Sequence, residues 1–232
     1  MRVHVAFTPE ESAAAPTGVV IDVIRATSTI CQALASGYER VLCVAEVEEA
    51  RSLRNGDGTV TLGGERLGVR IEGFDLGNSP REYLEPRSTV LGMSTTNGTK
   101  AIVTAAARCE HVLVASLLNL EAVVAAAQDA GQDVAVFCAG VKGAFALDDA
   151  YVAGRIAESL DGERSDAAEA AVRLARSYAS AEEAFRASRS GRNLIGHGPE
   201  LEADIGYCAR ESVLDVVPQL VGLRGVAAEV SL

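Results

Sequence analysis

The chain has 232 residues, of which 48% are hydrophobic and 23% charged, and its formal net charge is −11. This length and hydrophobic content suit a well-buried core, and the negative charge argues against nucleic acids and acidic membranes, which both require a positive face. An anionic ligand must therefore find its positive charge locally, in a few arginines, helix N-termini or a bound cation.

The sequence predicts neither a signal peptide nor a membrane span. Its first residues lead directly into an apolar run, and no apolar stretch approaches the roughly 20 residues that cross a bilayer. The five cysteines are widely spaced and form no C-x-x-C pair, a pattern that favours reduced thiols in the core. We therefore expect a cytoplasmic protein.

Short apolar runs alternate with helical patterns through the first two thirds of the chain. The strands are expected at 3–7, 18–23, 40–44, 59–62, 89–93, 111–115 and 133–137. The helices are expected at 27–36, 46–54, 98–107, 119–130 and 147–160, with a turn at 55–58. This alternation, with several runs that are largely apolar without a polar alternation, predicts an α/β fold whose mainly parallel sheet is covered on both faces.

The last third of the chain changes character. Residues 166–190 are rich in Ala, Arg and Glu and helical in pattern, and 199–210 predict another helix. A last strand is expected at 212–217, ended by a proline. Because no linker or repeat is visible, we expect a single domain over 1–232, with a possible helical insert at about 161–210 that brings Arg189 and Arg192 to the site.

Five polar clusters stand out, and most of them follow an apolar run. They read DVIRATST at 22–29, GER at 64–66, GFDLGNSP at 73–80, STTNGTK at 94–100 and SRSGRN at 188–193. In a parallel sheet, ligands gather at the carboxyl ends of the strands. Carboxylates, guanidinium groups, hydroxyls and glycines recurring there suit a divalent metal with a small phosphorylated or otherwise anionic ligand.

The first cluster is the most informative. Asp22 at a strand end is placed to hold a cation or to act as a nucleophile or base, and Arg25 can fork onto phosphate or sulfonate oxygens. Thr27 and Ser28 can cap the next helix, whose N–H groups can also cradle an anion. The alternative is a simple helix cap with a solvated arginine, but a cap does not require Asp22 or Arg25.

The other clusters leave alternatives open. Residues 94–100 form either an anion cradle or an ordinary turn and cap, and their glycine and lysine spacing differs from that of a P-loop. Glu65 and Asp75 are candidate metal ligands, and carboxylates without a His or Cys set suit Mg²⁺ rather than zinc. Asn78 and Ser79 can equally form a turn and the start of a helix. Asp148 and Asp149 either add a carboxylate to the metal site or begin the next helix.

Two known phosphatase mechanisms do not fit the sequence. A cysteine phosphatase loop beginning at Cys138 would require an arginine six residues later, where this chain has Ala144. A haloacid-dehalogenase-type phosphatase would require a second aspartate two residues after Asp22, where this chain has Ile24.

Taken together, these motifs resemble those of the 2-phosphosulfolactate phosphatase family. The resemblance rests on six ordered blocks: DVIRATST at 22–29, GERLG at 64–68, GFDLGNSP at 73–80, TTNGT at 95–99, CAG at 138–140 and SRSGRNL at 188–194. It implies a three-layer α/β/α fold and a homo-oligomer, expected to be a dimer. It also implies Mg²⁺-dependent hydrolysis of 2-phospho-3-sulfolactate to 3-sulfolactate and phosphate, a step in coenzyme M biosynthesis.

The residues and the resemblance together define a candidate site. The candidate catalytic residues are Asp22, Arg25, Thr27 and Ser28, and the candidate Mg²⁺ ligands are Asp22, Glu65 and Asp75. The candidate substrate-binding residues are Arg66, Asn78, Ser79, Thr95, Thr96, Asn97, Gly98, Gly140, Arg189, Ser190 and Gly191. Two rival functions remain: a phosphatase of another small phosphorylated metabolite, and a non-catalytic anion-binding protein.

Overall fold

The computed structural model describes residues 1–54 and 59–232, so the turn expected at 55–58 lies outside the described residues. The strands are β1 (Arg2–Ala6), β2 (Thr17–Ile21), β3 (Arg40–Val44), β4 (Val60–Arg66), β5 (Val69–Arg70), β6 (Val90–Ser94), β7 (His111–Ala115), β8 (Val134–Cys138), β9 (Glu163–Arg164), β10 (Gln219–Arg224) and β11 (Ala227–Ser231). The helices are α1 (Ala26–Ala35), α2 (Val47–Ser52), α3 (Gly98–Ala106), α4 (Leu120–Asp129), α5 (Leu147–Ser159), α6 (Asp166–Arg176), α7 (Ala181–Ala187), α8 (Arg189–Gly196) and α9 (Pro199–Cys208). Two short 3-10 helices are η1 (Pro80–Tyr83) and η2 (Leu117–Asn119).

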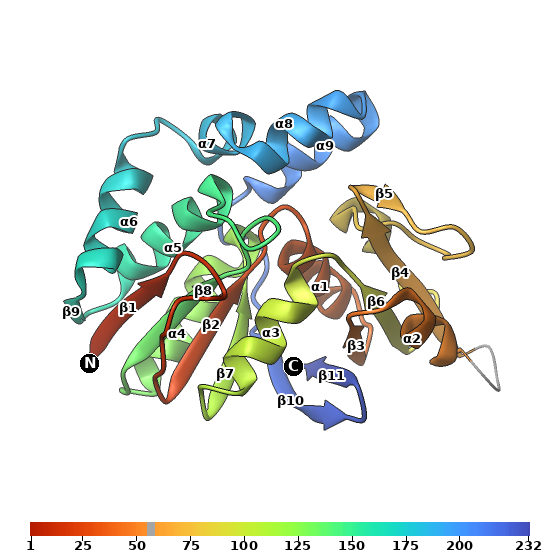
Figure 1. Cartoon of the computed structure of the whole chain (residues 1–232), viewed down its shortest axis with the longest axis horizontal. Helices are drawn as coiled ribbons and strands as arrows, with labels where there is room; N and C mark the ends of the chain where they lie inside the picture. Colours follow the sequence, from red (N-terminus) through yellow and green to blue (C-terminus); the bar gives the residue numbers. More distant parts are fainter. Residues whose placement is uncertain (55–58) are drawn as a thin grey trace.

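The strands form one mixed sheet in the order β5-β4-β6-β3-β11-β10-β7-β2-β8-β1-β9. Two parallel groups lie within it: β4, β6 and β3 form one, and β7, β2, β8 and β1 form the other. The antiparallel hairpin β10–β11 joins the groups, because β11 pairs with β3 and β10 pairs with β7 (Figure 1). The expectation of a three-layer α/β/α fold with a mainly parallel or mixed sheet is confirmed.

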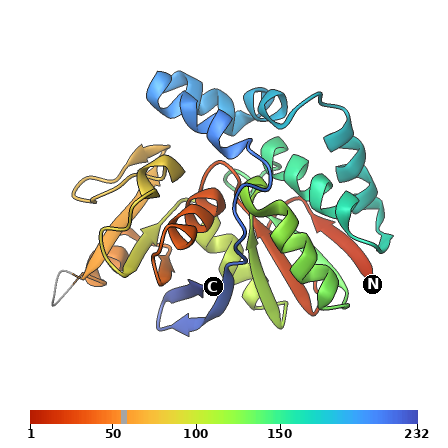
Figure 2. The same ribbon diagram turned by 180° about the vertical axis from the view of Figure 1, so that it is seen from behind.

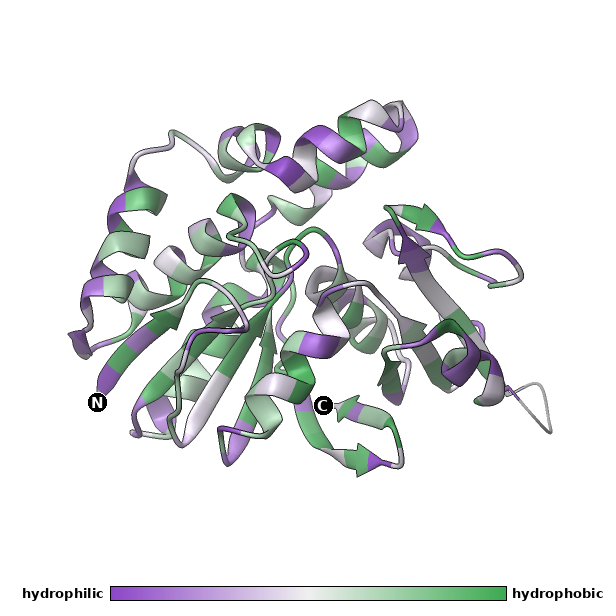
Figure 3. Cartoon of the chain, in the orientation of Figure 1, coloured by the Kyte–Doolittle hydropathy of each residue, from purple (hydrophilic) through white to green (hydrophobic). Residues whose placement is uncertain are grey.

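Successive strand residues face opposite sides of the sheet, as the pleat requires. In β1, Val3 and Val5 belong to an apolar cluster that includes residues of α4, α5, α6 and α7. Ala6 belongs to a second cluster, built on residues of α1 and α3. Both sides of the central strands are therefore apolar (Figure 3), which explains why these strands read as uninterrupted apolar runs.

In the helical segment α6–α9, helix α6 packs against α5 and β1, and helices α7 to α9 lie across the end of the molecule to which the parallel strands run (Figures 1 and 2). Residues 189–193, which carry most of the last polar cluster, form the first turns of α8, which begins after the N-cap Ser188. The Ser188 hydroxyl accepts a 2.9 Å bond from the Gly191 amide. Within the part of the chain that the structure describes, no helix is long and apolar enough to span a bilayer.

The strand expected at 212–217 is wrong. This segment is irregular, and the Ser212 and Leu214 amides donate to the carbonyls of Leu117 and Leu118 in η2 rather than to a strand. Pro218 does not end the last strand but precedes β10, its carbonyl accepting from the Val114 amide of β7. The last two strands of the chain, β10 and β11, therefore form a hairpin that the sequence pattern did not indicate.

Candidate functional site

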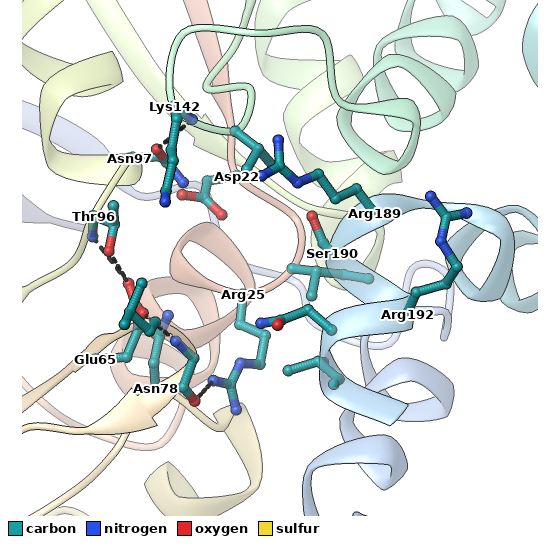
Figure 4. Close-up of a pocket in the computed structure, with 16 residues that line it drawn as sticks. Asp22, Arg25, Glu65, Asn78, Thr96, Asn97, Lys142, Arg189, Ser190 and Arg192 are labelled. Atoms are coloured by element: carbon teal, nitrogen blue, oxygen red, sulfur yellow. Dashed lines mark hydrogen bonds between the residues drawn. The ribbon is translucent and has the colours of Figure 1, made fainter. Parts of the chain in front are cut away.

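A cavity of about 420 Å³ opens at the carboxyl ends of the parallel strands, beneath the helical segment (Figure 4). It is lined by Asp22, Ile24, Arg25, Glu65, Leu67, Gly68, Asn78, Thr96, Asn97, Val141, Lys142, Arg189, Ser190, Arg192, Asn193 and Leu194. All five polar clusters contribute residues to this lining. The fold thus brings together segments that are more than a hundred residues apart in the sequence.

Asp22 follows β2 and is only 8% exposed. Burial raises the pKa of its carboxyl to about 7, and the nearby charge of Glu65 contributes to the rise. Its Oδ1 accepts a long bond of 3.4 Å from the Ala26 amide, and its carbonyl accepts one of 2.9 Å from the Thr27 amide. Asp22 therefore serves as the N-terminal acceptor for α1 while its carboxylate lines the cavity.

The capping role predicted for Thr27 and Ser28 is wrong, because α1 has Arg25 as its N-cap residue and no side-chain cap. The Thr27 hydroxyl accepts a 3.1 Å bond from the Asp22 amide, and the Ser28 hydroxyl donates a 2.8 Å bond to the Val23 carbonyl. Both side chains are fully buried and outside the cavity lining. They brace the loop that presents Asp22.

Glu65 lies near the end of β4, on the opposite side of the cavity from α8 (Figure 4). Its Oε1 accepts from the amide and hydroxyl of Thr96 at 3.0 and 2.8 Å, and its Oε2 accepts from the Gly68 amide at 2.7 Å. These bonds hold the carboxylate in one orientation beside the cavity. They also occupy the Thr96 amide, which the sequence suggested as part of an anion cradle.

Asn78 adds an unsatisfied acceptor to the same side of the cavity. Its side-chain oxygen Oδ1 is buried and has no hydrogen-bond partner, although the residue is only 4% exposed. Buried polar atoms are normally paired, so an orphaned acceptor in a cavity wall points to a ligand. Two carboxylates and an amide oxygen are hard ligands of the kind that Mg²⁺ prefers.

The third candidate metal ligand, Asp75, lies outside the cavity lining. Its carboxylate pairs with Arg54 and accepts a 2.8 Å bond from the Leu62 amide. Among the described residues, no group of three or more His, Cys, Asp or Glu side chains could hold a metal ion. The donors therefore fit a Mg²⁺ ion with one or two protein carboxylates and further oxygens from substrate and water, rather than a set of three carboxylates.

Arg25 lines the cavity, but its guanidinium is already engaged. Nη1 donates a 2.7 Å bond to Asp204 of α9, and Nη2 donates a 2.7 Å bond to the Gly68 carbonyl. The Arg25 side chain is 3% exposed. The predicted fork onto phosphate or sulfonate oxygens thus meets a competing carboxylate that the sequence did not reveal.

Three cationic residues line the cavity: Lys142, in the loop after β8, lies beside Asn97, whereas Arg189 and Arg192 of α8 lie on the opposite side (Figure 4). Among the described residues, neither the Lys142 ammonium nor the Arg189 guanidinium has a hydrogen bond or an ion pair. Arg192 donates through Nη1 to the Ala187 carbonyl. Unpaired cations in the cavity lining are the local positive charge that an anionic ligand of this acidic protein requires.

Behind α8 lie two further buried carboxyls, Asp148 and Asp149. Burial raises the pKa of Asp148 to about 6, and its side-chain oxygen Oδ1 has no hydrogen-bond partner. Asp149 accepts bonds of 3.0 and 2.9 Å from the Val23 and Gly140 amides. Asp149 therefore ties the β2 and β8 loops together.

The remaining predicted binding residues lie around the cavity rather than in its lining, except Asn97 and Ser190, which line it. Arg66 donates to the Ala45 carbonyl and the Ser94 hydroxyl at 2.7 and 2.9 Å. Ser79 donates to Asp204, and the Thr95 hydroxyl is buried without a partner. Three glycines are needed for close packing: Gly98, Gly140 and Gly191, where an added Cβ would lie 2.6 Å or less from the nearest atom.

Two site residues escaped the sequence analysis. Lys142 sits in a glycine-bounded loop after β8, and its amide donates a 3.2 Å bond to Asn97. The signal for it was the motif CAG at 138–140, just before Val141 and Lys142. Asp204 gave no signal, because its neighbours read as an ordinary helix.

Comparison with known proteins agrees with the motifs. The family described as 2-phosphosulpholactate phosphatase matches residues 4–222. A probable 2-phosphosulfolactate phosphatase of Thermus thermophilus is 41% identical, covering 98% of each chain. Relatives of the same printed name from Carboxydothermus hydrogenoformans and Deinococcus radiodurans are 37% and 39% identical, covering 94% and 95% of this chain and 93% and 94% of their own. The chain therefore belongs to the 2-phosphosulpholactate phosphatase family.

Proposed function

We propose that this protein is a Mg²⁺-dependent phosphatase that hydrolyses 2-phospho-3-sulfolactate to 3-sulfolactate and phosphate. One observation carries the proposal: a single cavity is lined both by the buried carboxylates of Asp22 and Glu65 and by the unpaired cations Lys142 and Arg189. A pure anion-binding site would not gather carboxylates beside its ligand unless a cation lay between them. The names of the relatives state this activity and so support the same interpretation.

Asp22, Glu65 and the side-chain oxygen of Asn78 would hold the ion. When bound there, Mg²⁺ would supply the positive charge that phosphate oxygens need during transfer. Asp22 has a second task, for which its raised pKa suits it. It either accepts a proton from the attacking water or attacks phosphorus itself.

The cations would recognise the rest of the substrate. The Arg189 guanidinium can form two parallel bonds with a sulfonate, carboxylate or phosphate group, and Lys142 offers three donors from the loop after β8. Ser190, beside Arg189, adds a hydroxyl to the same wall. A substrate with two anionic groups in addition to its phosphate would match this separation of charge in the cavity.

The direct test is phosphate release from 2-phospho-3-sulfolactate and a panel of other phosphorylated hydroxy acids, sugar phosphates and nucleotides, with Mg²⁺ and with a chelator. We expect release from 2-phospho-3-sulfolactate that requires Mg²⁺ and exceeds release from every other compound. Preference for another compound would transfer the proposal to that substrate. Tight binding of a compound without phosphate release would favour the anion-binding function. Undiminished phosphate release in the presence of chelator would refute the requirement for a metal ion.

A further inference from the structure

Asp204 is a fully buried carboxylate of α9 and lies at the centre of a hydrogen-bond network. Its Oδ2 accepts from Arg25 at 2.7 Å, and its Oδ1 accepts from the Ser79 hydroxyl at 2.6 Å. Arg81 lies 3.7 Å from Oδ1. A buried ion pair offsets its desolvation cost only when short hydrogen bonds satisfy both partners, as they do here. The loss of one partner leaves the other charged, buried and unpaired.

The network joins two sides of the cavity, the side of Asp22 and Glu65 and the side of α8. Arg25 belongs to the loop that carries Asp22, and its Nη2 binds the Gly68 carbonyl in the turn that follows Glu65. On the other side, Asp204 belongs to α9, which packs against α8 and its cations.

The turn after Glu65 also contacts the helical segment directly. Nε2 of His197, the residue that follows α8, lies 3.1 Å from the Leu67 carbonyl. The turn at 67–68 is thus held both by Arg25 from the sheet side and by His197 from the helical segment. A displacement of Arg25 would therefore be transmitted to the Glu65 side of the cavity.

We infer that Asp204 is a positioning residue for the active site. By accepting a bond from the Arg25 guanidinium, it holds the Asp22 loop and the turn after Glu65 against the helical segment. The guanidinium is then paired with Asp204 and does not bind the substrate. Arg25 therefore has a structural role, although its place in the motif suggests a phosphate ligand. The catalytic part of the test below rests on the proposed function, and the exchange measurement does not.

The first experiment is chemical rescue. Arg25→Ala leaves a space beside Asp204 that free guanidinium can enter, and we expect millimolar guanidinium to restore kcat/KM about tenfold relative to the same concentration of NaCl. In Arg25→Ala/Asp204→Asn the carboxylate partner is gone, so we expect less than about twofold rescue. Equal rescue in both backgrounds would show that Arg25 acts on the substrate, and it would overturn the inference.

The second experiment is amide hydrogen exchange, which needs no turnover. In Asp204→Asn we expect exchange of residues 66–70 and 189–196 to rise about tenfold or more while strand β7 stays protected. The matched control is Glu202→Gln, on the same helix, which breaks only an exposed pair with Arg186. Unchanged exchange at 66–70 in Asp204→Asn would refute the positioning role of Asp204.

A milder variant covers the case in which Asp204→Asn unfolds. Ser79→Ala removes one of the bonds to Asp204 and leaves the ion pair with Arg25 intact. We expect a smaller rise in exchange confined to the same segments, and no rise there would overturn the inference. If the wild type releases no phosphate, the exchange result still decides the role of Asp204, so the two proposals fail separately.

Discussion

At the scale of single residues, Asp22 combines two requirements that conflict without a cation. As a proposed metal ligand it must be ionised, yet burial and the charge of Glu65 raise its pKa to about 7. The unfolded chain releases the same proton near the ordinary value of 3.8. Between these two pH values the folded protein holds more protons, so the free energy of unfolding of the metal-free protein should fall as pH rises.

Asp22→Asn should therefore abolish turnover and stabilise the metal-free protein at pH 8. We expect a gain of about 1–3 kcal/mol in the free energy of unfolding at pH 8 and a much smaller difference at pH 4. Urea unfolding with a chelator at both pH values measures this, with the exposed Asp129→Asn as control. Near-wild-type kcat would remove Asp22 from the mechanism, and an unchanged pH dependence would contradict the electrostatic argument.

The site also depends on the absence of a Cβ atom at Gly98. A Cβ there would lie 2.6 Å from Cβ of Ala26 and 3.0 Å from Oδ2 of Asp22. We expect Gly98→Ala to displace Asp22, reducing kcat about tenfold or more and stability by about 1–3 kcal/mol. Gly222→Ala is the control, because nothing lies within 4 Å of its added Cβ. Steady-state kinetics and thermal unfolding test it, and a Gly98→Ala enzyme with unchanged kcat would disprove the constraint.

At the scale of elements, the loop after β8 and helix α8 place the two unpaired cations. We expect Lys142→Ala and Arg189→Ala each to raise KM for 2-phospho-3-sulfolactate about 10- to 100-fold, the effect of losing a charge-assisted bond. For a simple phosphate ester with no second acidic group, the rise should be much smaller. Equal effects on both substrates would remove these residues from recognition.

The matched control for this experiment is Lys100→Ala. Lys100 is exposed on α3, outside the cavity lining, and its ammonium also has no hydrogen bond or ion pair among the described residues. Its removal changes the net charge by the same amount as Lys142→Ala. A rise in KM shared by Lys100→Ala would therefore mean that the long-range charge of the protein, rather than direct contact, governs substrate binding.

The elements that the sequence predicted well are those whose signal is local. Central strands such as β2 and β8 are largely apolar, and α1 ends shortly before Gly37, a glycine with positive φ. The hairpin β10–β11 was missed because its pairing with β3 and β7 is long-range, and the faces of β10 are mostly exposed. The strand predicted at 212–217 failed because its amides find acceptors in η2.

The same distinction explains which site residues were found. Asp22, Glu65 and Arg189 stand in short motifs, so their positions at element ends were readable. The partner of Arg25 is 179 residues away, and nothing in the helical pattern around Asp204 marks it. Asp75 also stands in a short motif, but the structure satisfies its charge with Arg54 and a backbone amide, outside the cavity lining.

At the scale of the whole molecule, the cavity spans the two parallel groups of the sheet. Asp22 follows β2 in one group, whereas Glu65 and Thr96 belong to the ends of β4 and β6 in the other. Between the groups, the sheet is continuous only through β10 and β11. The hairpin contributes no residue to the cavity lining, yet it sets the spacing between the two groups.

Ending the chain after Pro218 should therefore destroy the site without removing any lining residue. The deletion exposes the edges of β3 and β7 and removes Ala228 and Val230, two fully buried side chains of the core. We expect loss of cooperative thermal unfolding, measured by circular dichroism, together with loss of Mg²⁺-dependent turnover. Val221→Thr, at a 64% exposed position of β10, is the control and should change stability by no more than about 0.5 kcal/mol. A truncated chain that unfolds cooperatively at the wild-type temperature would show that α1 and the helical segment alone hold the two groups of strands in register.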